Sequence, residues 1–231
     1  MRDPDTAAHI IGKLVKQLHQ QLSQAKIYVF DNNSTDNSIE EAQTAGAIVQ
    51  SVKKQGKGHV VKTMFRDIDA DYYIMMDADA TYPLDHISEH LQLCITHKCD
   101  MLVGNRSRHF HKSASRSGHY WGNRILTRTL NLLFDADYAD ILSGYRILSS
   151  RFVKSIPLFS GGFEIETILS VHAIEVDAKI MEVEIDYLPR PKESFSKLNT
   201  YQDGFKILMT INPMIRTKMA ITTLGPKSHN N

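Results

Sequence analysis

The chain has 231 residues, of which 42% are hydrophobic and 23% are charged, and its formal net charge is +1. This length favours one large domain with ample material for a core, and the composition is typical of a globular protein. There is no signal peptide and no run of 18 apolar residues, so we expect no membrane-spanning segment. The two cysteines, Cys94 and Cys99, form no C-x-x-C pattern and indicate free thiols in a reducing compartment.

The first 105 residues alternate between helical and strand-like patterns. Apolar spacing predicts helices over about 9–24, 37–45, 57–69 and 83–97, and strands over about 26–30, 47–49, 72–76 and 101–104. The connections are too long for hairpins, so this rhythm indicates a mostly parallel sheet with helices on both faces. We therefore expect an α/β fold in a single domain.

The pattern changes beyond residue 105. After a polar, basic loop, the later segments are predicted as helices over about 120–134 and 163–175, a strand over about 179–187, and a terminal helix from Tyr201. Residues 101–134 contain no Asp or Glu but carry six basic residues: Arg106, Arg108, Lys112, Arg116, Arg124 and Arg128. Such a block suits an anionic partner, although a solvated helix face explains the charge equally well.

Acidic residues end two of the predicted strands. Asp77 and Asp79 directly follow the apolar run 72–76, and Asp31 ends the run 26–30. Open α/β sheets bind ligands beyond the carboxyl ends of their strands, so these carboxylates are expected to converge there. Of the five D-x-D matches in the chain, only the one at Asp77 directly ends an apolar strand. Such a pair can contact both a nucleotide and a divalent cation, which prefers oxygen ligands.

A glycine-flanked lysine, Gly56-Lys57-Gly58, opens the helix predicted at 57–69. Its backbone N–H groups and its cation suit a phosphate, although such a triplet is also common in ordinary loops.

Together, the motifs resemble bacterial family 2 glycosyltransferases of the GT-A fold, in the dolichyl-phosphate-mannose-synthase-like branch. The resemblance covers about residues 8–212, and it is carried by the order and spacing of VFDNNSTDNS (29–38), QGKGHVVKTMF (55–65), MMDADATYP (75–83), VGNR (103–106), GHYWGNRILTR (118–128), DILSGYR (140–146), GFEIET (162–167) and RPKESFSKLNTYQDG (190–204). It implies transfer of a sugar from a nucleotide-sugar donor, with Mg²⁺ or Mn²⁺, to a polyprenyl phosphate or another cell-envelope glycan precursor. We expect no nucleic-acid partner, and a location in the cytoplasm or at the inner face of the membrane.

The resemblance also implies roles for the residues of these motifs. Asp31 would contact the nucleoside base, with Lys57 near it, and Asp77 would contact the ribose and the diphosphate. Asp79 would ligate the metal, with Asp77 as a second ligand. A metal held there would act as a Lewis acid that neutralises the leaving diphosphate.

The chemical class of the acceptor determines which other residues would take part in the transfer reaction. A phosphate acceptor is already anionic and needs no general base, and three arginines of the basic block would then hold it: Arg106, Arg124 and Arg128. A hydroxyl acceptor requires a carboxylate base, for which there are two candidates, Glu164 and Glu166. Glutamates near a helix start are also explained by ordinary dipole pairing.

Three further basic residues are candidates for binding the acceptor or a phosphate: Arg146, Arg190 and Lys197. Arg146 lies in the DILSGYR motif and is equally suited to pairing with a carboxylate inside the fold. Arg190 and Lys197 lie in a loop that could close over the diphosphate, whereas a solvated loop is the ordinary expectation.

The beginning of the chain departs from the family pattern. Family members start with an apolar strand and a P-x-Y-N-E-type turn, whereas residues 1–8 are polar and residues 6–15 match the segment immediately after that turn. The absent strand would lie inside the sheet, beside the strands that end at Asp31 and Asp77. Buried backbone groups left unpaired there would each cost about 1–3 kcal/mol. We therefore expect an N-terminally incomplete GT-A domain over 1–217, weakly active or inactive in this form, and a flexible tail over 218–231.

Two other classes of function remain open. Asp77-Ala78-Asp79-Ala80-Thr81 matches the D-x-D-x-T motif of haloacid-dehalogenase-type phosphatases, in which the first Asp attacks phosphate. Against this class, no paired acids follow the strand predicted over 179–187. The other class is a non-catalytic protein of the same fold that binds a nucleotide or an anionic lipid.

Overall fold

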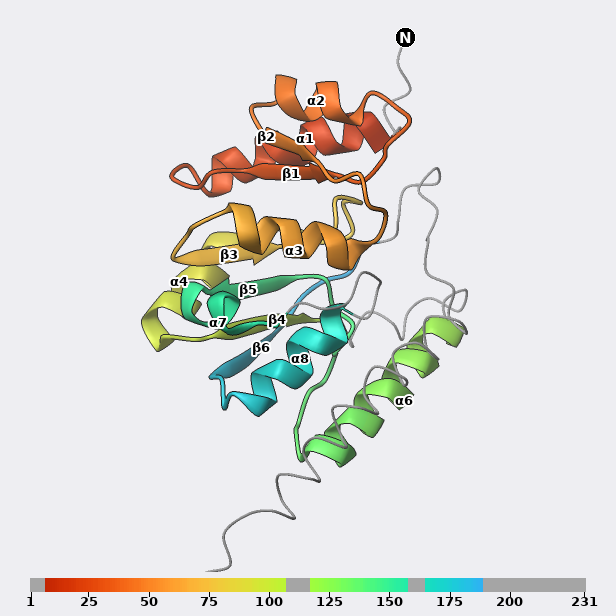
Figure 1. The fold of residues 1–231 in the computed structure, drawn as a ribbon, viewed down its shortest axis with the longest axis vertical. Coiled ribbons are helices and arrows are strands. Elements are labelled where there is room, and N and C mark those ends of the chain that lie inside the picture. Colours follow the sequence, from red (N-terminus) through yellow and green to blue (C-terminus); the bar gives the residue numbers. More distant parts are fainter. Residues whose placement is uncertain (1–6, 107–116, 158–164, 189–231) are drawn as a thin grey trace, which may run out of the picture.

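The computed structural model describes residues 7–106, 117–157 and 165–188, and Figure 1 shows their arrangement. The first part of the chain forms α1 (Ala7–Gln21), β1 (Tyr28–Asp31), α2 (Ser38–Thr44), β2 (Ile48–Ser51) and α3 (Lys57–Asp67). The middle part forms β3 (Tyr72–Met75), α4 (Ile87–His97), β4 (Met101–Asn105) and α6 (Ser117–Phe134). The last part forms β5 (Arg146–Ser149), α7 (Ser150–Ser155), α8 (Ile165–Glu175) and β6 (Ile180–Glu184).

The strands form two separate sheets. β1 and β2 pair in parallel, with Tyr28 opposite Ile48. The larger sheet has the order β3-β5-β4-β6. In it, β4 and β6 are parallel, whereas β5 runs antiparallel to both β3 and β4. The alternation of strands and helices is as predicted, and β5 is a reversed strand that the sequence analysis did not foresee.

The strand arrangement is interrupted between β1 and β3. Within the described residues no strand precedes α1, and neither β1 nor β3 has a strand partner on its second edge. In the view of Figure 1 the two sheets lie one above the other, and α3 overlaps β3 below β1. In the described residues β1 and β3 therefore belong to different sheets, and the incompleteness of the domain stays a prediction.

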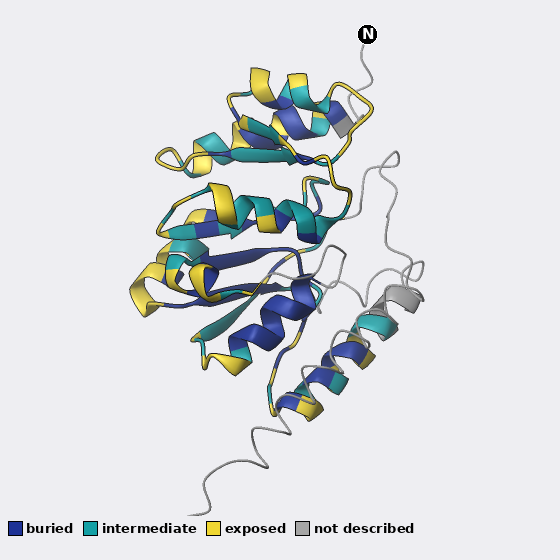
Figure 2. Ribbon diagram, in the orientation of Figure 1, coloured by how far each residue is buried: buried dark blue, intermediate teal, exposed yellow. Residues whose placement is uncertain are grey.

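The main core surrounds the larger sheet. β4 is buried from Met101 to Gly104, and β5 is buried from Arg146 to Leu148. Every residue of α8 from Ile165 to Ala173 is buried, and Figure 2 shows this helix in dark blue along most of its length. A helix buried on all sides belongs inside a core. The larger sheet and α8 thus form the most enclosed part of the described chain.

Three local features differ from the sequence-based expectation. β5 and the short helix α7 were not predicted; Ser149 caps α7 by accepting a hydrogen bond from the Phe152 N–H at 3.2 Å. α4 begins at Ile87 rather than at Pro83, because the Ile87 N–H donates to the Leu84 carbonyl and closes a turn before the helix. Among the described residues, no helix has the length and apolar character needed to cross a bilayer.

Candidate functional site

Asp31 and Asn32 organise the loop that follows β1. Asp31 Oδ1 accepts a hydrogen bond from the Ser34 N–H at 3.0 Å, which closes the turn at the end of the strand. The Asn32 amide donates to two backbone carbonyls after β2, at 2.7 and 3.0 Å, and its Oδ1 accepts from the Gly56 N–H at 2.8 Å. Asn32 therefore fastens the end of β1 to the start of α3.

Lys57, in the first turn of α3, joins two carboxylates. Its Nζ lies 2.6 Å from Asp77 Oδ1, just beyond β3, and 2.5 Å from Glu166 Oε1 in the first turn of α8. The side chains of Lys57 and Glu166 are only 19% and 7% exposed, whereas that of Asp77 is 36% exposed. Burial by itself would lower the pKa of Lys57, but the adjacent carboxylates outweigh burial and raise this pKa well above its ordinary value. The lysine therefore stays protonated between its two partners.

These contacts bring the carboxyl ends of β1 and β3 to the same helix start. Gly56 bonds to Asn32 at the end of β1, and its neighbour Lys57 bonds to Asp77 at the end of β3. Both strand ends thus meet at the first turn of α3. Such a position beyond strand ends is where open α/β sheets bind ligands.

The loop 140–146 packs tightly against this cluster at Gly144. A Cβ atom on Gly144 would lie 2.7 Å from Asp77 Oδ2 and 3.1 Å from Lys57 Nζ, so a larger residue there would push the Asp77 carboxylate out of its present position. The Gly144 N–H donates to the Tyr82 hydroxyl at 3.0 Å, which ties the loop to the segment after Asp79. Glycine at this position therefore lets the backbone approach the carboxylate without displacing it.

Asp79 lies in a tight turn of its own. Its Oδ1 accepts hydrogen bonds from the Thr81 hydroxyl at 2.5 Å and from the Thr81 N–H at 3.2 Å. Ala80, between them, has a φ of 54°, a left-handed conformation that is uncommon for alanine. Backbone strain of this kind persists only where surrounding contacts enforce it, and it clusters at ligand-binding turns. The turn therefore fixes the direction of the Asp79 carboxylate.

Asp77 and Asp79 are the predicted metal ligands, and they lie two residues apart just beyond the end of β3. Within the described ranges, no three His, Cys, Asp or Glu side chains come close enough to form a metal cage. Mg²⁺ is usually bound by one or two carboxylates together with substrate phosphates, rather than by a cage made only of protein ligands. The two carboxylates therefore fit a cation that binds together with a diphosphate.

Arg106 forms a buried ion pair with Asp140. Its Nε and Nη2 lie 2.7 and 3.0 Å from the two carboxylate oxygens, and Asn123 of α6 donates to the same carboxylate at 2.8 Å. Burial by itself would raise the pKa of Asp140, but the charge and hydrogen bonds of Arg106 keep this pKa below its ordinary value. This geometry favours a structural role for Arg106 over the predicted role in acceptor binding.

Arg146 is fully buried at the start of β5. It donates to the carbonyls of Ser143 and Ile141 at 3.1 and 2.8 Å and to the Ser170 hydroxyl at 3.0 Å. Burial lowers the pKa of this guanidinium, and the negative charge of Glu166 opposes the shift. Of the two roles considered for Arg146, its burial favours the structural one, which it performs through carbonyl and hydroxyl partners.

The remaining basic and acidic candidates are placed differently. Arg124 and Arg128 are exposed on α6, so their role in acceptor binding stays a prediction. Three candidates lie outside the described residues: Glu164, Arg190 and Lys197.

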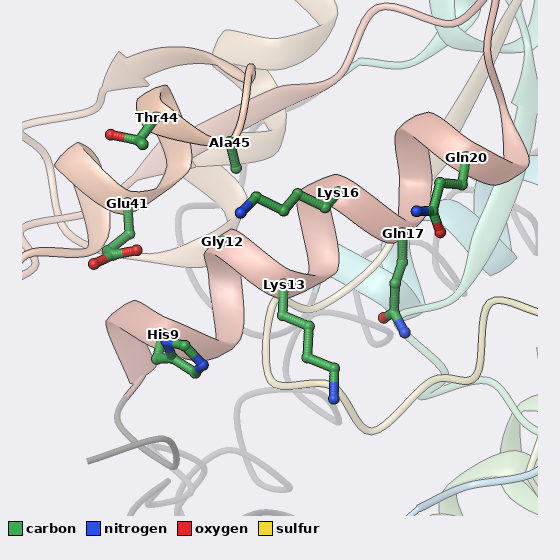
Figure 3. A pocket seen from close by; sticks show the side chains of 9 residues that line it. All are labelled: His9, Gly12, Lys13, Lys16, Gln17, Gln20, Glu41, Thr44 and Ala45. Carbon is green, nitrogen blue, oxygen red and sulfur yellow. The ribbon is translucent and has the colours of Figure 1, made fainter. Parts of the chain in front are cut away.

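A surface hollow of about 350 Å³ lies between α1 and α2, as Figure 3 shows. Its lining includes four ionisable residues, His9, Lys13, Lys16 and Glu41. Gly12 lets the two helices approach, since a Cβ there would lie 3.3 Å from Glu41 Oε2. None of the predicted site residues lines this hollow, so it is separate from the carboxylate cluster.

Several named proteins are similar to this chain over part or most of its length. Protein RfbJ of Shigella flexneri is 43% identical over 109 residues, which are 47% of this chain and 84% of RfbJ. Glycosyltransferase AglJ of Haloferax volcanii is 32% identical over 202 residues, 87% of this chain and 66% of AglJ. Dolichol-phosphate mannosyltransferase of Pyrococcus furiosus is 24% identical over 153 residues, 61% of this chain and 42% of that enzyme. The chain thus spans about two thirds of AglJ and less than half of the mannosyltransferase.

The fold has solved counterparts. Glucosyl-3-phosphoglycerate synthase from Mycobacterium tuberculosis, in complex with Mn²⁺, UDP-glucose and phosphoglyceric acid, superposes with a TM-score of 0.70. The match covers 91% of this chain and 76% of the synthase at 18% identity, so it shows the fold alone.

The fold and the strand-end carboxylates together define an α/β protein of the GT-A class. A family model described as Glycosyl transferase family 2 matches residues 6–156, and the chain belongs to this family. The predicted family and fold class are confirmed.

Three residues of this cluster are sequence-predicted site candidates, but the contacts that join them are not evident from the sequence. Lys57, Asp77 and Glu166 were each candidates, whereas the ion pairs that join them were not foreseen. Gly144 and Asn32 were missed as site residues. The Ser-Gly-Tyr step within DILSGYR was the available signal for Gly144, since an isolated glycine often marks a close backbone approach.

Proposed function

We propose that this chain transfers a sugar from a nucleotide-sugar donor to an acceptor, with Mg²⁺ or Mn²⁺. The observation that carries the proposal is the strand-end cluster of Asp77, Asp79 and Lys57 in a chain of this family. AglJ is named as a glycosyltransferase, and the synthase with the same fold was solved with Mn²⁺ and UDP-glucose. The family and the fold give no support to the phosphatase alternative.

Each carboxylate in the cluster has a distinct role in this proposal. Asp31 and Asp77 contact the nucleoside part of the donor, and Asp77 and Asp79 hold the cation. When bound, that cation neutralises the charge of the leaving diphosphate as a Lewis acid. Lys57 holds the Asp77 carboxylate in place, and Gly144 keeps the space beside it clear of any side chain.

Glu166 is the described candidate for a general base, and its contacts favour a different role. Its Oε1 is 2.5 Å from the protonated Lys57, and its side chain is only 7% exposed. A general base must reach the proton that it removes. We therefore assign Glu166 to positioning Lys57, and through Lys57 to positioning Asp77.

The acceptor that suits this site is a polyprenyl phosphate. A phosphate oxygen is already anionic, so it attacks the anomeric carbon without a general base. The bond from that carbon to the diphosphate breaks, and the nucleoside diphosphate leaves with the electron pair. The name of the relative dolichol-phosphate mannosyltransferase supports a lipid-phosphate acceptor, and so do the exposed cations Arg124 and Arg128.

The primary test compares donor binding by the wild-type chain and by Asp79→Asn. We expect a nucleotide-sugar from a UDP- and GDP-sugar panel to raise the melting temperature only with Mn²⁺ or Mg²⁺, because a ligand that binds the folded state stabilises it. Asp79→Asn should abolish this metal-dependent shift and lower transfer to polyprenyl phosphate about 100-fold or more. Asp79 is preferred to Asp77 for this test because Asp77 also pairs with buried Lys57.

The matched control is Asp69→Asn, which alters an exposed carboxylate of another D-x-D pair. This variant should behave as wild type in both assays. Binding without turnover would favour a non-catalytic nucleotide-binding protein, an alternative that the interrupted sheet makes worth testing. If no nucleotide-sugar binds with metal, or if Asp79→Asn binds as wild type does, the proposal is wrong.

A further inference from the structure

The helix α6 presents large apolar side chains away from the core. Its inner face is buried at Leu126, Leu130 and Phe134. On the opposite side, Ile125 is 61% exposed and Leu132 is 85% exposed. Helices of globular proteins turn their apolar stripe towards the core and their polar side outwards. Two exposed aliphatic residues seven positions apart, on the outward side, therefore indicate a partner for this face.

The outward face of α6 is also cationic. At 3.6 residues per turn, Ile125, Arg128 and Leu132 fall on one stripe, and Arg124 lies beside it. Both arginines are exposed, and Figure 2 shows exposed residues alternating with buried ones along this helix. Residues 101–134 contain no acidic side chain, and the next carboxylates, Asp135 and Asp137, follow the end of the helix.

We propose that this apolar and basic face of α6, formed by Arg124, Ile125, Arg128 and Leu132, docks the protein on an anionic lipid bilayer. Charge complementarity selects this partner. Anionic headgroups attract arginines near the surface, while the aliphatic side chains enter the boundary of the acyl region. A symmetric contact between two copies of the chain would instead set arginines against arginines, which is electrostatically unfavourable.

The inner face of α6 links this surface to the strand-end site. Asn123 donates to Asp140 at 2.8 Å, at the start of the loop 140–146. The same loop places Gly144 against Asp77. A docked α6 would therefore hold the donor site close to the bilayer, where a polyprenyl phosphate is found. This functional purpose rests on the proposed sugar transfer, whereas docking itself rests on α6 alone.

The test is co-sedimentation of the full chain with vesicles. We expect binding to vesicles that contain phosphatidylglycerol, weak binding to vesicles of phosphatidylcholine alone, and a decrease in binding as salt screens the charges. Arg128→Gln should weaken partitioning about five-fold. The double variant Ile125→Ser with Leu132→Ser should weaken it about tenfold or more, because two aliphatic side chains no longer enter the interface.

Ile95→Ser is the matched control, since Ile95 is 45% exposed on α4, away from α6. It should bind vesicles as wild type does. The proposal is overturned if wild-type protein ignores anionic vesicles, or if the double variant binds as strongly as wild type. It is equally overturned if the double change only alters the oligomeric mass in sedimentation velocity, since the face would then join copies of the chain. The assay needs no donor, so a failure of sugar transfer leaves its result intact.

Discussion

The small sheet and the large sheet are built from similar apolar strands but are covered to very different degrees. β4 pairs with a strand on both edges and is buried from Met101 to Gly104. β1 pairs on one edge only, and its residues from Tyr28 to Phe30 are half-buried. An apolar strand sequence therefore does not by itself ensure burial.

The candidate donor site depends on both regions. Asp31 and Asn32 come from the small sheet, whereas Asp77 and Glu166 come from the larger one and its helix. α3 connects them, because Gly56 and Lys57 at its start bond to one region each. The rigidity of the site is thus limited by the less enclosed region.

The largest effect should follow from breaking the buried ion pair in the larger region. Asp140→Ala leaves Arg106 buried without its carboxylate, and we expect the free energy of unfolding to fall by about 3–5 kcal/mol. Urea denaturation measures this change. The control is Asp69→Ala, which breaks an exposed pair with Lys154 and should cause no measurable change. A loss for Asp140→Ala no larger than for the control would contradict the enclosed character of this region.

Amide hydrogen exchange should reveal the open edge of β1 within a single strand. The Ile48 N–H donates to the Ile27 carbonyl, and the Val52 N–H donates to the Asp31 backbone carbonyl. In this parallel pairing the N–H groups of Val29 and Asp31 point towards β2, so the N–H groups of Tyr28 and Phe30 point away from it. We expect these two amides to exchange roughly 100-fold faster than that of Val29.

The matching measurement in the larger region uses two consecutive amides of β4. The backbone N–H of Leu102 points towards β5 and that of Val103 points towards β6. Both amides should therefore exchange slowly with solvent in residue-resolved NMR measurements. Slow exchange at Tyr28 and Phe30 would mean that a further partner covers the edge of β1.

A matched pair of truncations should measure the difference in packing. Val103→Ala, in β4, should lower the free energy of unfolding by about 2 kcal/mol, because two buried methyl groups are lost and a cavity remains. Val29→Ala, in β1, should cost about half as much, since this side chain is only half-buried. Equal losses in denaturation experiments would show that the small sheet is as tightly packed as the large one.

The smallest effect should be the acid dependence contributed by Asp140. Its pKa is lower in the folded chain than in the unfolded chain, so the folded state binds fewer protons. The resulting stabilisation is complete above about pH 4 and is lost as the pH falls through the folded-state pKa. Asp140→Asn should therefore lose less stability than wild type between pH 5 and the acid transition, as followed by denaturation at several pH values. Equal acid losses in the two proteins would exclude this contribution.

Much of the fold was predictable because most elements show clear periodicity. β3 and β4 are short apolar runs, and the predicted helix over 120–134 lies within α6. β5 was missed because it begins with Arg146 and ends with Ser149, which leaves only two apolar residues between them. Its antiparallel place between β3 and β4 is decided by contacts distant in the sequence, which local patterns do not report.

The sequence predicted those candidate site residues that directly follow an apolar strand. Asp31, Asp77 and Asp79 were predicted as site residues because charged residues at the ends of apolar strands are conspicuous. The Lys57–Glu166 pair was not foreseen, because it joins α3 to α8 across much of the chain. Charge alone also did not distinguish Arg106 and Arg146, whose contacts are internal, from Arg124 and Arg128, which are exposed.

The second edges of β1 and β3 have a practical consequence for anyone who handles the protein. An edge strand with unpaired N–H and C=O groups is a template on which another extended chain can assemble. Among the described residues each of these strands has a strand partner on one edge only, so mild heating or high concentration should drive such edges into strand-paired aggregates earlier than closed sheet edges.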